Sequence, residues 1–230
     1  MERDELDVRA KEPRETPVRP WLWQGIVFLL VTVLVAGLGL VAALALGLGS
    51  PTPRRAPDWT ATGAAWRRFG DGSVTASDDS YEISLSQPGQ RAWAVANLSI
   101  ADFDLELNVR SLLPSEDVGF GLLYRYQDPA NHYLFAIGGD GYYTIARIQG
   151  GKQTPLRAWQ QWPHVRRGAA TNRLRVRCRE ARCRFYVNGE FAAEITDDAF
   201  LAGKLGLWAQ SFSDDVLAVR FYGMRLWSLN

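Results

Sequence analysis

The chain has 230 residues, a formal net charge of +1 at pH 7, and 47% hydrophobic and 22% charged residues. This length fits one globular domain with appendages, and so balanced a charge gives no support for nucleic-acid binding. Glycine (21 residues) and tryptophan (9 residues) are frequent. Because aromatic residues fill pleated surfaces and glycine adopts positive φ, the composition favours short strands joined by tight turns over a helix-rich fold.

The N-terminal part divides into a polar tail and an apolar stretch. Residues 1–20 are rich in charge and proline, so they bury too little surface to offset their ordering entropy, and we predict a disordered tail. Residues 22–48 include no charged side chain. At about 1.5 Å per residue this stretch is longer than the roughly 30 Å hydrocarbon core of a bilayer. We therefore predict one transmembrane helix over residues 21–49, in contact with the lipid bilayer.

A cleaved signal peptide is the alternative to this anchor. The segment Ala43-Leu44-Ala45 is similar to a small-residue cleavage site, but the apolar run is longer than the roughly 7 to 15 residues usual in such peptides. Lys and Arg are more frequent before the run than after it. The positive-inside rule therefore predicts a single-pass protein of the cell membrane, with a cytoplasmic N-terminus and an extracytoplasmic C-terminal domain.

Small residues recur at a spacing of four within the predicted span, at Gly39, Ala43 and Gly47. This spacing is typical of close-packed homodimers of membrane helices, but glycine and alanine are common in such helices anyway, so both interpretations stay open. Residues 50–59 contain several prolines, which indicates a stiff linker between the membrane and the domain.

Beyond the linker, over residues 60–230, the hydrophobic period becomes two. Apolar and polar residues alternate from Asp102 to Arg110, so that one face of a strand is dry and the other is wet. Similar runs occur at Tyr81–Leu85, Arg91–Ala96, Val118–Tyr126, His132–Ile137, Tyr142–Ile148, Leu174–Cys178, Cys183–Val187, Phe191–Ile195, Leu205–Gln210 and Val216–Trp227. The dipeptide Asn188-Gly189 predicts a type I′ hairpin. About ten short strands of this spacing predict an all-β, two-sheet antiparallel β-sandwich of the jelly-roll type.

Cys178 and Cys183 are the only two cysteines. If they face each other across a hairpin, the same register sets Val176 opposite Phe185 on an apolar face. Directly opposed residues lie within disulfide range, so we predict a disulfide, with two packed thiols as the alternative.

Eight arginines and one acidic residue lie between residues 166 and 184. Such a strip suits anionic lipid headgroups or cell-wall polyanions. The alternative, which we prefer, is the solvated face of a hairpin paired with acidic residues elsewhere.

The segments DFDLELNVR, VGFGLLYRYQDPANHYLFAI, GYYTIARI, NRLRVRC, FYVNGEFAAEITD and GKLGLWAQ resemble the laminin G-like, concanavalin A-like jelly-roll family. In particular they resemble its 3-keto-disaccharide hydrolase, or glycoside-hydrolase-like, branch. The likeness runs from about Trp66 to Trp227. It implies a carbohydrate-related module, although the fold alone does not fix the chemistry.

No catalytic set is predicted. Paired carboxylates occur where turns are expected, at Asp78–Asp79, Asp197–Asp198 and Asp214–Asp215, and aspartate is common in turns. A glycosidase generally needs two carboxyl groups that flank the scissile bond. His132 and His164 are the only histidines, so no multi-histidine metal site is expected. We predict no cofactor, with a calcium site built from turn oxygens as the alternative.

Sugar binding favours aromatic platforms beside hydrogen-bonding side chains. The predicted ligand-binding residues are Arg125, Tyr133, Tyr143, Arg147, Trp159 and Trp162. The prediction assumes that Arg125 faces Tyr133 across a strand pair and that Trp159 and Trp162 wall one end from a loop. Core or rim packing of these side chains is the alternative.

The sequence thus predicts a membrane-anchored, non-catalytic module that binds carbohydrate or another cell-envelope ligand, such as a cell-wall polymer. One alternative is a glycoside-active hydrolase or a lyase of 3-keto sugars. Another is a structural envelope protein that joins a partner through its membrane helix.

Overall fold

The computed structural model describes residues 24–25, 27–35, 54–55, 66–77, 79–213 and 215–229. The chain forms two compact units, Met1–Pro51 and Thr52–Asn230. In the first unit residues 27–35 are helical, and Thr32 Oγ1 donates a hydrogen bond of 2.8 Å to the Phe28 carbonyl. Among the described residues, no helix combines the length and the apolar character that crossing a bilayer requires.

Most of the predicted N-terminal features fall on residues that the structure does not describe. The tail 1–20, most of the span 21–49 and the whole of the Gly39, Ala43 and Gly47 face lie outside the described residues. The anchor, its orientation and the helix dimer therefore stay predictions.

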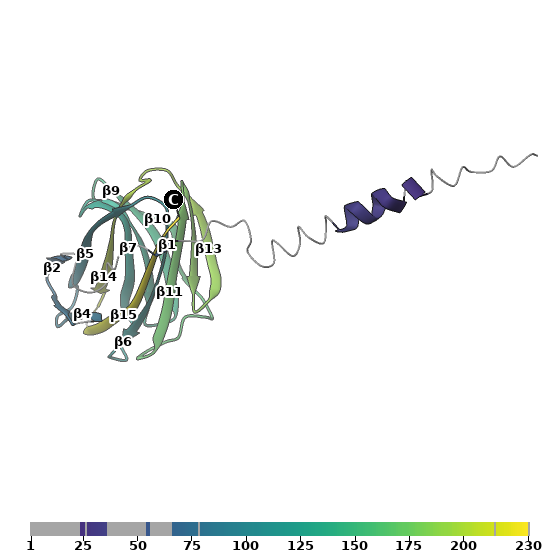
Figure 1. The fold of residues 1–230 in the computed structure, drawn as a ribbon. Helices are drawn as coiled ribbons and strands as arrows, with labels where there is room; N and C mark the ends of the chain where they lie inside the picture. The colour runs from purple at the N-terminus through teal and green to yellow at the C-terminus, as the bar shows by residue number, and fades with distance from the viewer. Residues whose placement is uncertain are drawn as a thin grey trace, which may run out of the picture. The chain divides into compact units, whose positions relative to one another are not determined.

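The second unit is a sandwich of two antiparallel sheets, which confirms the predicted fold (Figure 1). The first sheet has the spatial order β13 (Glu190–Thr196), β12 (Arg182–Val187), β11 (Thr171–Arg179), β6 (Phe103–Ser111), β15 (Leu217–Ser228), β4 (Ser80–Leu85) and β3 (Ser73–Ala76), and β1 (Arg54–Arg55) also pairs with β15. The second sheet has the order β10 (Lys152–Gln161), β9 (Tyr142–Gln149), β8 (Asn131–Gly138), β7 (Val118–Asp128), β14 (Gly203–Ser211), β5 (Arg91–Ile100) and β2 (Trp66–Gly70).

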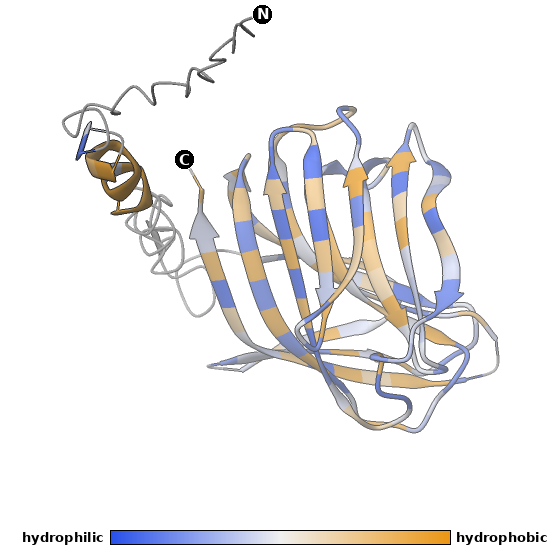
Figure 2. Cartoon of the chain, turned by 90° about the vertical axis from the view of Figure 1, so that its right-hand side faces the viewer, coloured by the Kyte–Doolittle hydropathy of each residue, from blue (hydrophilic) through white to orange (hydrophobic). Residues whose placement is uncertain are grey.

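The alternating sequence builds the core between these sheets. Figure 2 shows hydrophobic and hydrophilic residues following one another as stripes along the strands. In β6, Leu105 and Leu107 are fully buried, whereas Glu106 between them keeps some exposure. Across the sandwich, the rings of Phe135 in β8 and Phe185 in β12 lie 5.1 Å apart. Each such large apolar side chain contributes about 1.5–3 kcal/mol when fully buried.

The hairpin of β11 and β12 has the predicted register. Cys178 pairs with Cys183 and forms a disulfide with a Cα–Cα distance of 4.1 Å. Val176 faces Phe185, as expected. At the next turn Asn188 and Gly189 have φ values of 56° and 95°, the positive pair that a type I′ turn requires.

Four strands were not expected. These are β1, which lies inside the predicted linker, and β2, β3 and β10. Strand β10 is an edge strand that contains Pro155, and its pairing with β9 is interrupted by two register shifts, between Pro155 and Arg157 and between Arg157 and Gln160. The prediction that the segment around Trp159 is a loop is therefore wrong.

The pairing register defines two ends of the sandwich. Strand β1 pairs with Trp227 and Ser228, the last residues of β15, and these lie beside the start of β6. The start of β6 in turn pairs with Cys178 at the end of β11. We call this the disulfide end. The opposite end, where β7 begins at Val118, is the far end.

The disulfide generates a prediction about stability. Replacing both Cys178 and Cys183 by alanine should lower the free energy of unfolding by about 2 kcal/mol, because the short closed loop no longer restricts the unfolded chain. Chemical denaturation with and without reductant checks this, and reductant should affect only the wild type. Two titratable thiols in the denatured, non-reduced domain would contradict the disulfide itself.

Candidate functional site

Arg125 lies inside the sandwich at the disulfide end. Tyr124, and not Arg125, faces Tyr133, so the predicted pairing is wrong. The cause is a register shift between Tyr124 and Asp128, where Arg125 has a φ of 49° and leaves the regular alternation. Its side chain is 1% exposed.

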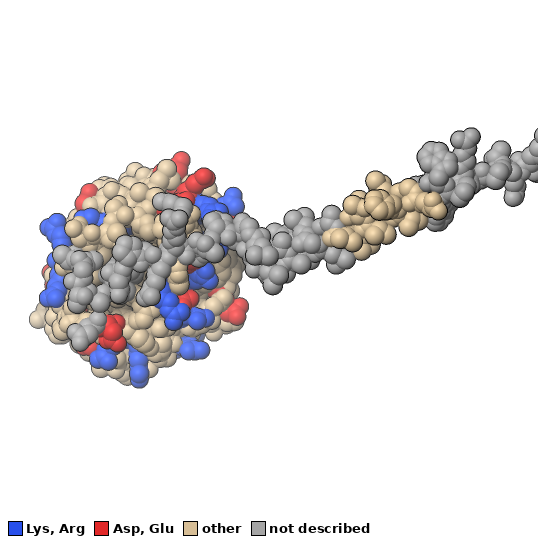
Figure 3. Space-filling view, viewed as in Figure 1, with Lys and Arg blue, Asp and Glu red and all other residues tan. Residues whose placement is uncertain are grey.

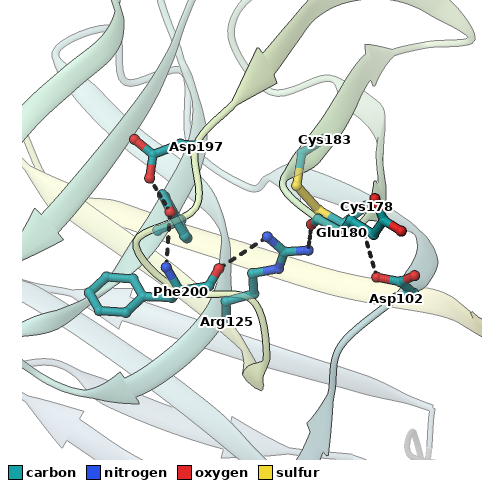
Figure 4. Close-up of a disulfide and its surroundings, with 8 residues drawn as sticks. Asp102, Arg125, Cys178, Glu180, Cys183, Asp197 and Phe200 are labelled. Carbon is teal, nitrogen blue, oxygen red and sulfur yellow. Dashed lines mark hydrogen bonds between the residues drawn. A yellow bond between two sulfur atoms is a disulfide. The ribbon is translucent and has the colours of Figure 1, made fainter.

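The guanidinium of Arg125 connects the two sheets. It donates hydrogen bonds to the carbonyl of Phe200, at 3.0 Å, and to the carbonyl of Glu180, in the turn between β11 and β12 (Figure 4). Burial lowers the pKa of this guanidinium. Arg125 is thus a structural clamp rather than a surface cation.

A second polar cluster surrounds Asp197, in the segment that follows β13. Arg147 Nη1 lies 2.6 Å from Asp197 Oδ2, and the Tyr133 hydroxyl donates to Asp197 Oδ1. That hydroxyl also accepts a hydrogen bond of 3.3 Å from the Phe200 amide. Burial raises the pKa of Asp197, but the hydrogen bonds from Tyr133, the Ala199 amide and Arg147 outweigh burial and leave this pKa below its usual value.

Tyr143 also packs inside the sandwich. Its hydroxyl donates a hydrogen bond of 3.0 Å to the Ala192 carbonyl, and the ring of Trp162 meets it edge-on at 6.1 Å. Tyr133, Tyr143 and Arg147 share a face, as expected, but it is the face turned toward the other sheet. With Tyr133 and Tyr143 each 2% exposed, their contact with a ligand stays a prediction.

The outer face of the second sheet is different, because it carries its own apolar cluster. Its members are Val95, Leu123, Tyr126, Leu134, Ala136, Ala146, Ile148 and Trp208. Beside them the rings of Phe69 and Trp93 stack at 5.5 Å. Two hollows open on this face, one at each end of the sandwich.

The larger hollow lies at the far end and measures about 380 Å³. We call it the far-end cleft, and it is lined by Glu116, Asp117, Val118, Gly138, Asp140, Tyr142, Trp159 and Phe212. Trp159 and Phe212 are 37% and 42% exposed, and their rings meet edge-to-face with centroids 5.9 Å apart. Aromatic rings are costly to leave in water, so a pair displayed in a hollow favours a ligand site.

Main-chain contacts fix the acidic wall of the cleft. Asp215 Oδ2 accepts hydrogen bonds from the amides of Glu116 and Asp117, at 3.1 and 2.9 Å. At Gly119 an added Cβ would lie 3.1 Å from the ring of Phe212. The glycine therefore leaves the room in which that ring sits.

The lining can do two kinds of chemistry. The carboxylates of Glu116, Asp117 and Asp140 can accept hydrogen bonds from hydroxyl groups, and the rings of Trp159 and Phe212 can pack on C–H surfaces. The volume falls within the range of about 300–1,000 Å³ for small-molecule sites. In the described part of the chain, no three His, Cys, Asp or Glu side chains gather in a group that could hold a metal ion. The calcium alternative stays a prediction.

The smaller hollow, at the disulfide end, measures about 160 Å³. Phe69 and Tyr126 line it, with Lys204 Nζ 3.0 Å from Asn97 Oδ1. Its size falls below the usual range for a ligand pocket, so we take the far-end cleft as the candidate site.

Of the six predicted ligand-binding residues, only Trp159 lines the far-end cleft. Sequence reasoning missed Phe212, Tyr142 and Asp140 as lining residues of a site. The signal that could have found the cleft is the pair Gly119 and Gly121, which alternate with buried apolar residues. They leave the first part of β7 without large side chains on the outer face.

Comparisons with known proteins support the fold. No family model and no curated protein sequence matches the chain. A carbohydrate-binding module of Bacillus subtilis, CBM66, is 17% identical, with a TM-score of 0.57 over 70% of this chain and 95% of that one. The exoplasmic/lumenal domain of VIP36, in its Ca²⁺/Man3GlcNAc-bound form, is 13% identical, with a TM-score of 0.55 over 77% and 91%. A native glycosidic hydrolase is 12% identical, with a TM-score of 0.56 over 78% and 96%.

At such low identity these likenesses concern the fold alone. They confirm the predicted resemblance at that level, because the second unit shares its jelly-roll β-sandwich with a carbohydrate-binding module, a lumenal domain and a glycosidic hydrolase. The same fold carries both binding modules and enzymes, so it does not separate the two activities.

The depressed pKa of Asp197 generates a prediction about pH. Its ionised form is stabilised by folding, so its contribution is fully present above the unfolded pKa of about 3.9 and is lost as the pH falls through the lower folded pKa. Asp197→Asn should therefore be less stable than the wild type at neutral pH. The difference in stability between the two proteins should become smaller below about pH 4. Denaturation midpoints measured against pH check this.

The matched control is Asp198→Asn, because this exposed neighbour makes no hydrogen bond among the described residues. Its denaturation midpoint at neutral pH should stay close to that of the wild type. A constant difference between Asp197→Asn and the wild type down to the lowest pH would contradict the role of the Asp197 carboxylate.

Proposed function

We propose that the chain is a membrane-anchored, extracytoplasmic module that binds carbohydrate in the far-end cleft without catalysis. The observation that carries this proposal is the pair of exposed rings, Trp159 and Phe212, set at right angles beside three carboxylates. A sugar has both apolar C–H surfaces and hydroxyl groups. In the cleft the aromatic rings can pack on the C–H surfaces, and the carboxylates can accept hydrogen bonds from the hydroxyl groups.

Two further observations support the proposal. The fold is shared with a carbohydrate-binding module and with a lumenal domain that holds a mannose-containing oligosaccharide in its solved form. The cleft also lies at the end of the sandwich opposite β1, the strand that follows the predicted anchor.

Hydrolysis of a glycosidic bond is the second candidate function. Glu116, Asp117 and Asp140 line the same cleft as the aromatic wall, and a pair of carboxyl groups is what most glycosidases require. Binding is preferred because the acidic residues of the cleft all lie in turns or bends between strands, where such residues are common without a catalytic role. A 3-keto-disaccharide substrate belongs to this second candidate.

The proposal predicts a loss of sugar binding on removal of the aromatic wall. Trp159→Ala should weaken binding to the glycans selected on an array by at least about tenfold, equal to about 1.4 kcal/mol. Phe191→Ala is the matched control, because Phe191 is an exposed aromatic on β13 of the other sheet, 51% exposed. Equal weakening by both variants, or no glycan bound at millimolar concentration, would overturn the proposal.

The enzyme candidate is tested on the same protein. Glu116→Gln and Asp140→Asn keep the shape of the side chains but remove acid and base chemistry, so a binding module should show no change in product formation from glycans or 3-keto-disaccharides. If the wild type turns a substrate over and one of these variants abolishes turnover while binding persists, the cleft is catalytic.

A further inference from the structure

Two pairs of arginines face each other directly across the disulfide hairpin. In the register of β11 and β12, Arg177 is opposite Arg184, and Arg179 is opposite Arg182, with the disulfide pair between them in sequence. Because the cysteines point into the core, all four arginines point to the outer face of the first sheet. Like charges placed directly opposite each other in a ladder repel, so this arrangement costs stability unless something compensates it.

Acidic neighbours compensate only part of this charge. Glu194 lies 2.6 Å from Arg184 but 3.7 Å from Arg182. Asp104 is held by Arg175 in a bidentate pair, at 2.7 and 2.6 Å, and lies 3.9 Å from Arg177. These pairs bear out, for part of the strip, the solvated-face interpretation of its arginines.

Arg179 makes no ion pair within the part of the chain that the structure describes. The four arginines, 177, 179, 182 and 184, line a hollow of about 240 Å³, and no carboxylate lines it. The surface seen in Figure 3 mixes basic and acidic side chains. The hollow is therefore a local excess of one sign, with room for an oxyanion.

The hairpin that carries this arginine quartet is held rigidly. The disulfide joins its strands on the inner side, the Arg125 clamp binds the Glu180 carbonyl at its turn, and Asp102 accepts a hydrogen bond of 2.7 Å from the Glu180 amide. The four side chains thus project from an ordered main chain, and the planar forks of their guanidinium groups match the oxygens of a phosphate group.

The position of the quartet points to the source of the phosphate. The quartet lies at the disulfide end, where β1 joins the first sheet. Only residues 50–53 separate β1 from the predicted membrane span 21–49, and four residues reach at most about 14 Å. If the anchor is in place, the disulfide end cannot move far from the lipid headgroups.

We propose that the arginine quartet binds the phosphate groups of anionic phospholipids and so holds the disulfide end of the domain on the membrane. This goes beyond the proposed carbohydrate binding and uses the opposite end of the sandwich. It rests on the proposed membrane anchor but not on sugar binding in the far-end cleft.

The fragment Thr52–Asn230 tests the proposal without the anchor, since it is a compact unit that contains both sheets and the whole core. It should sediment with vesicles of phosphatidylcholine and phosphatidylglycerol but not with phosphatidylcholine alone, and added salt should release it. The double variant Arg179→Gln/Arg182→Gln should lower vesicle affinity by at least about tenfold, because each basic side chain near a charged membrane contributes about a factor of five.

The matched control is Arg110→Gln/Arg220→Gln. Arg110 and Arg220 also face each other in the first sheet, but at the far end, so the control removes the same charge from the same sheet. Its vesicle affinity should stay within about twofold of the wild type. Trp159→Ala should also bind vesicles normally, even if it has lost sugar binding.

Three outcomes would overturn the proposal. The first is no difference between the two kinds of vesicle, and the second is an equal loss of affinity in both double variants. The third is binding of inorganic phosphate, measured by calorimetry, without binding to the vesicles, which would assign the quartet to a free anion instead of a headgroup.

Discussion

The structure of the disulfide end depends on one buried guanidinium, that of Arg125. Arg125 belongs to β7 of the second sheet. It donates to the carbonyls of Glu180, in the turn between β11 and β12, and of Phe200, in the segment between β13 and β14. Hydrogen bonds from a charged donor contribute about 1.5–3 kcal/mol each, and the carbonyls would be left unpaired without it. The negative charges of Asp102 and Asp197 favour the protonated guanidinium and so offset part of the cost of burying its charge.

This clamp requires an exact fit of the main chain. At Gly203 an added Cβ would lie 2.5 Å from the backbone of Arg125. Gly203 itself has a φ of 154°, which few other residues adopt. The bulge, the glycine and the guanidinium therefore form one unit, and together they position the disulfide hairpin on one side and the Asp197 segment on the other.

The strands that could be predicted are those with one buried, apolar face and one solvent-exposed, polar face. Strand β6 alternates along its whole length, and the opposed cysteines gave the register of β11 and β12. Strand β10 escaped prediction because it is an edge strand with most of its side chains exposed, so it lacks an apolar period.

The candidate site was harder to predict than the fold. Arg125 was predicted to face Tyr133 because a regular strand pairing was assumed. The structure has a register shift there, and such a bulge leaves no clear mark in a single sequence. The far-end cleft joins residues from β10, from the turn before β7 and from the segment after β14. These segments are far apart in the sequence and come together only in the folded chain, so no local sequence pattern predicts that they form one cleft.

Strand β10 has one more consequence, for proteins crowded on a surface. An open sheet edge offers free amides and carbonyls to the edge of a neighbouring copy, and confinement to a membrane would bring copies together. In β10, Pro155 has no amide hydrogen to donate, and the two register shifts in its pairing with β9 interrupt the regular strand geometry. This edge is thereby a poor template for a second chain, which protects the domain against edge-to-edge aggregation.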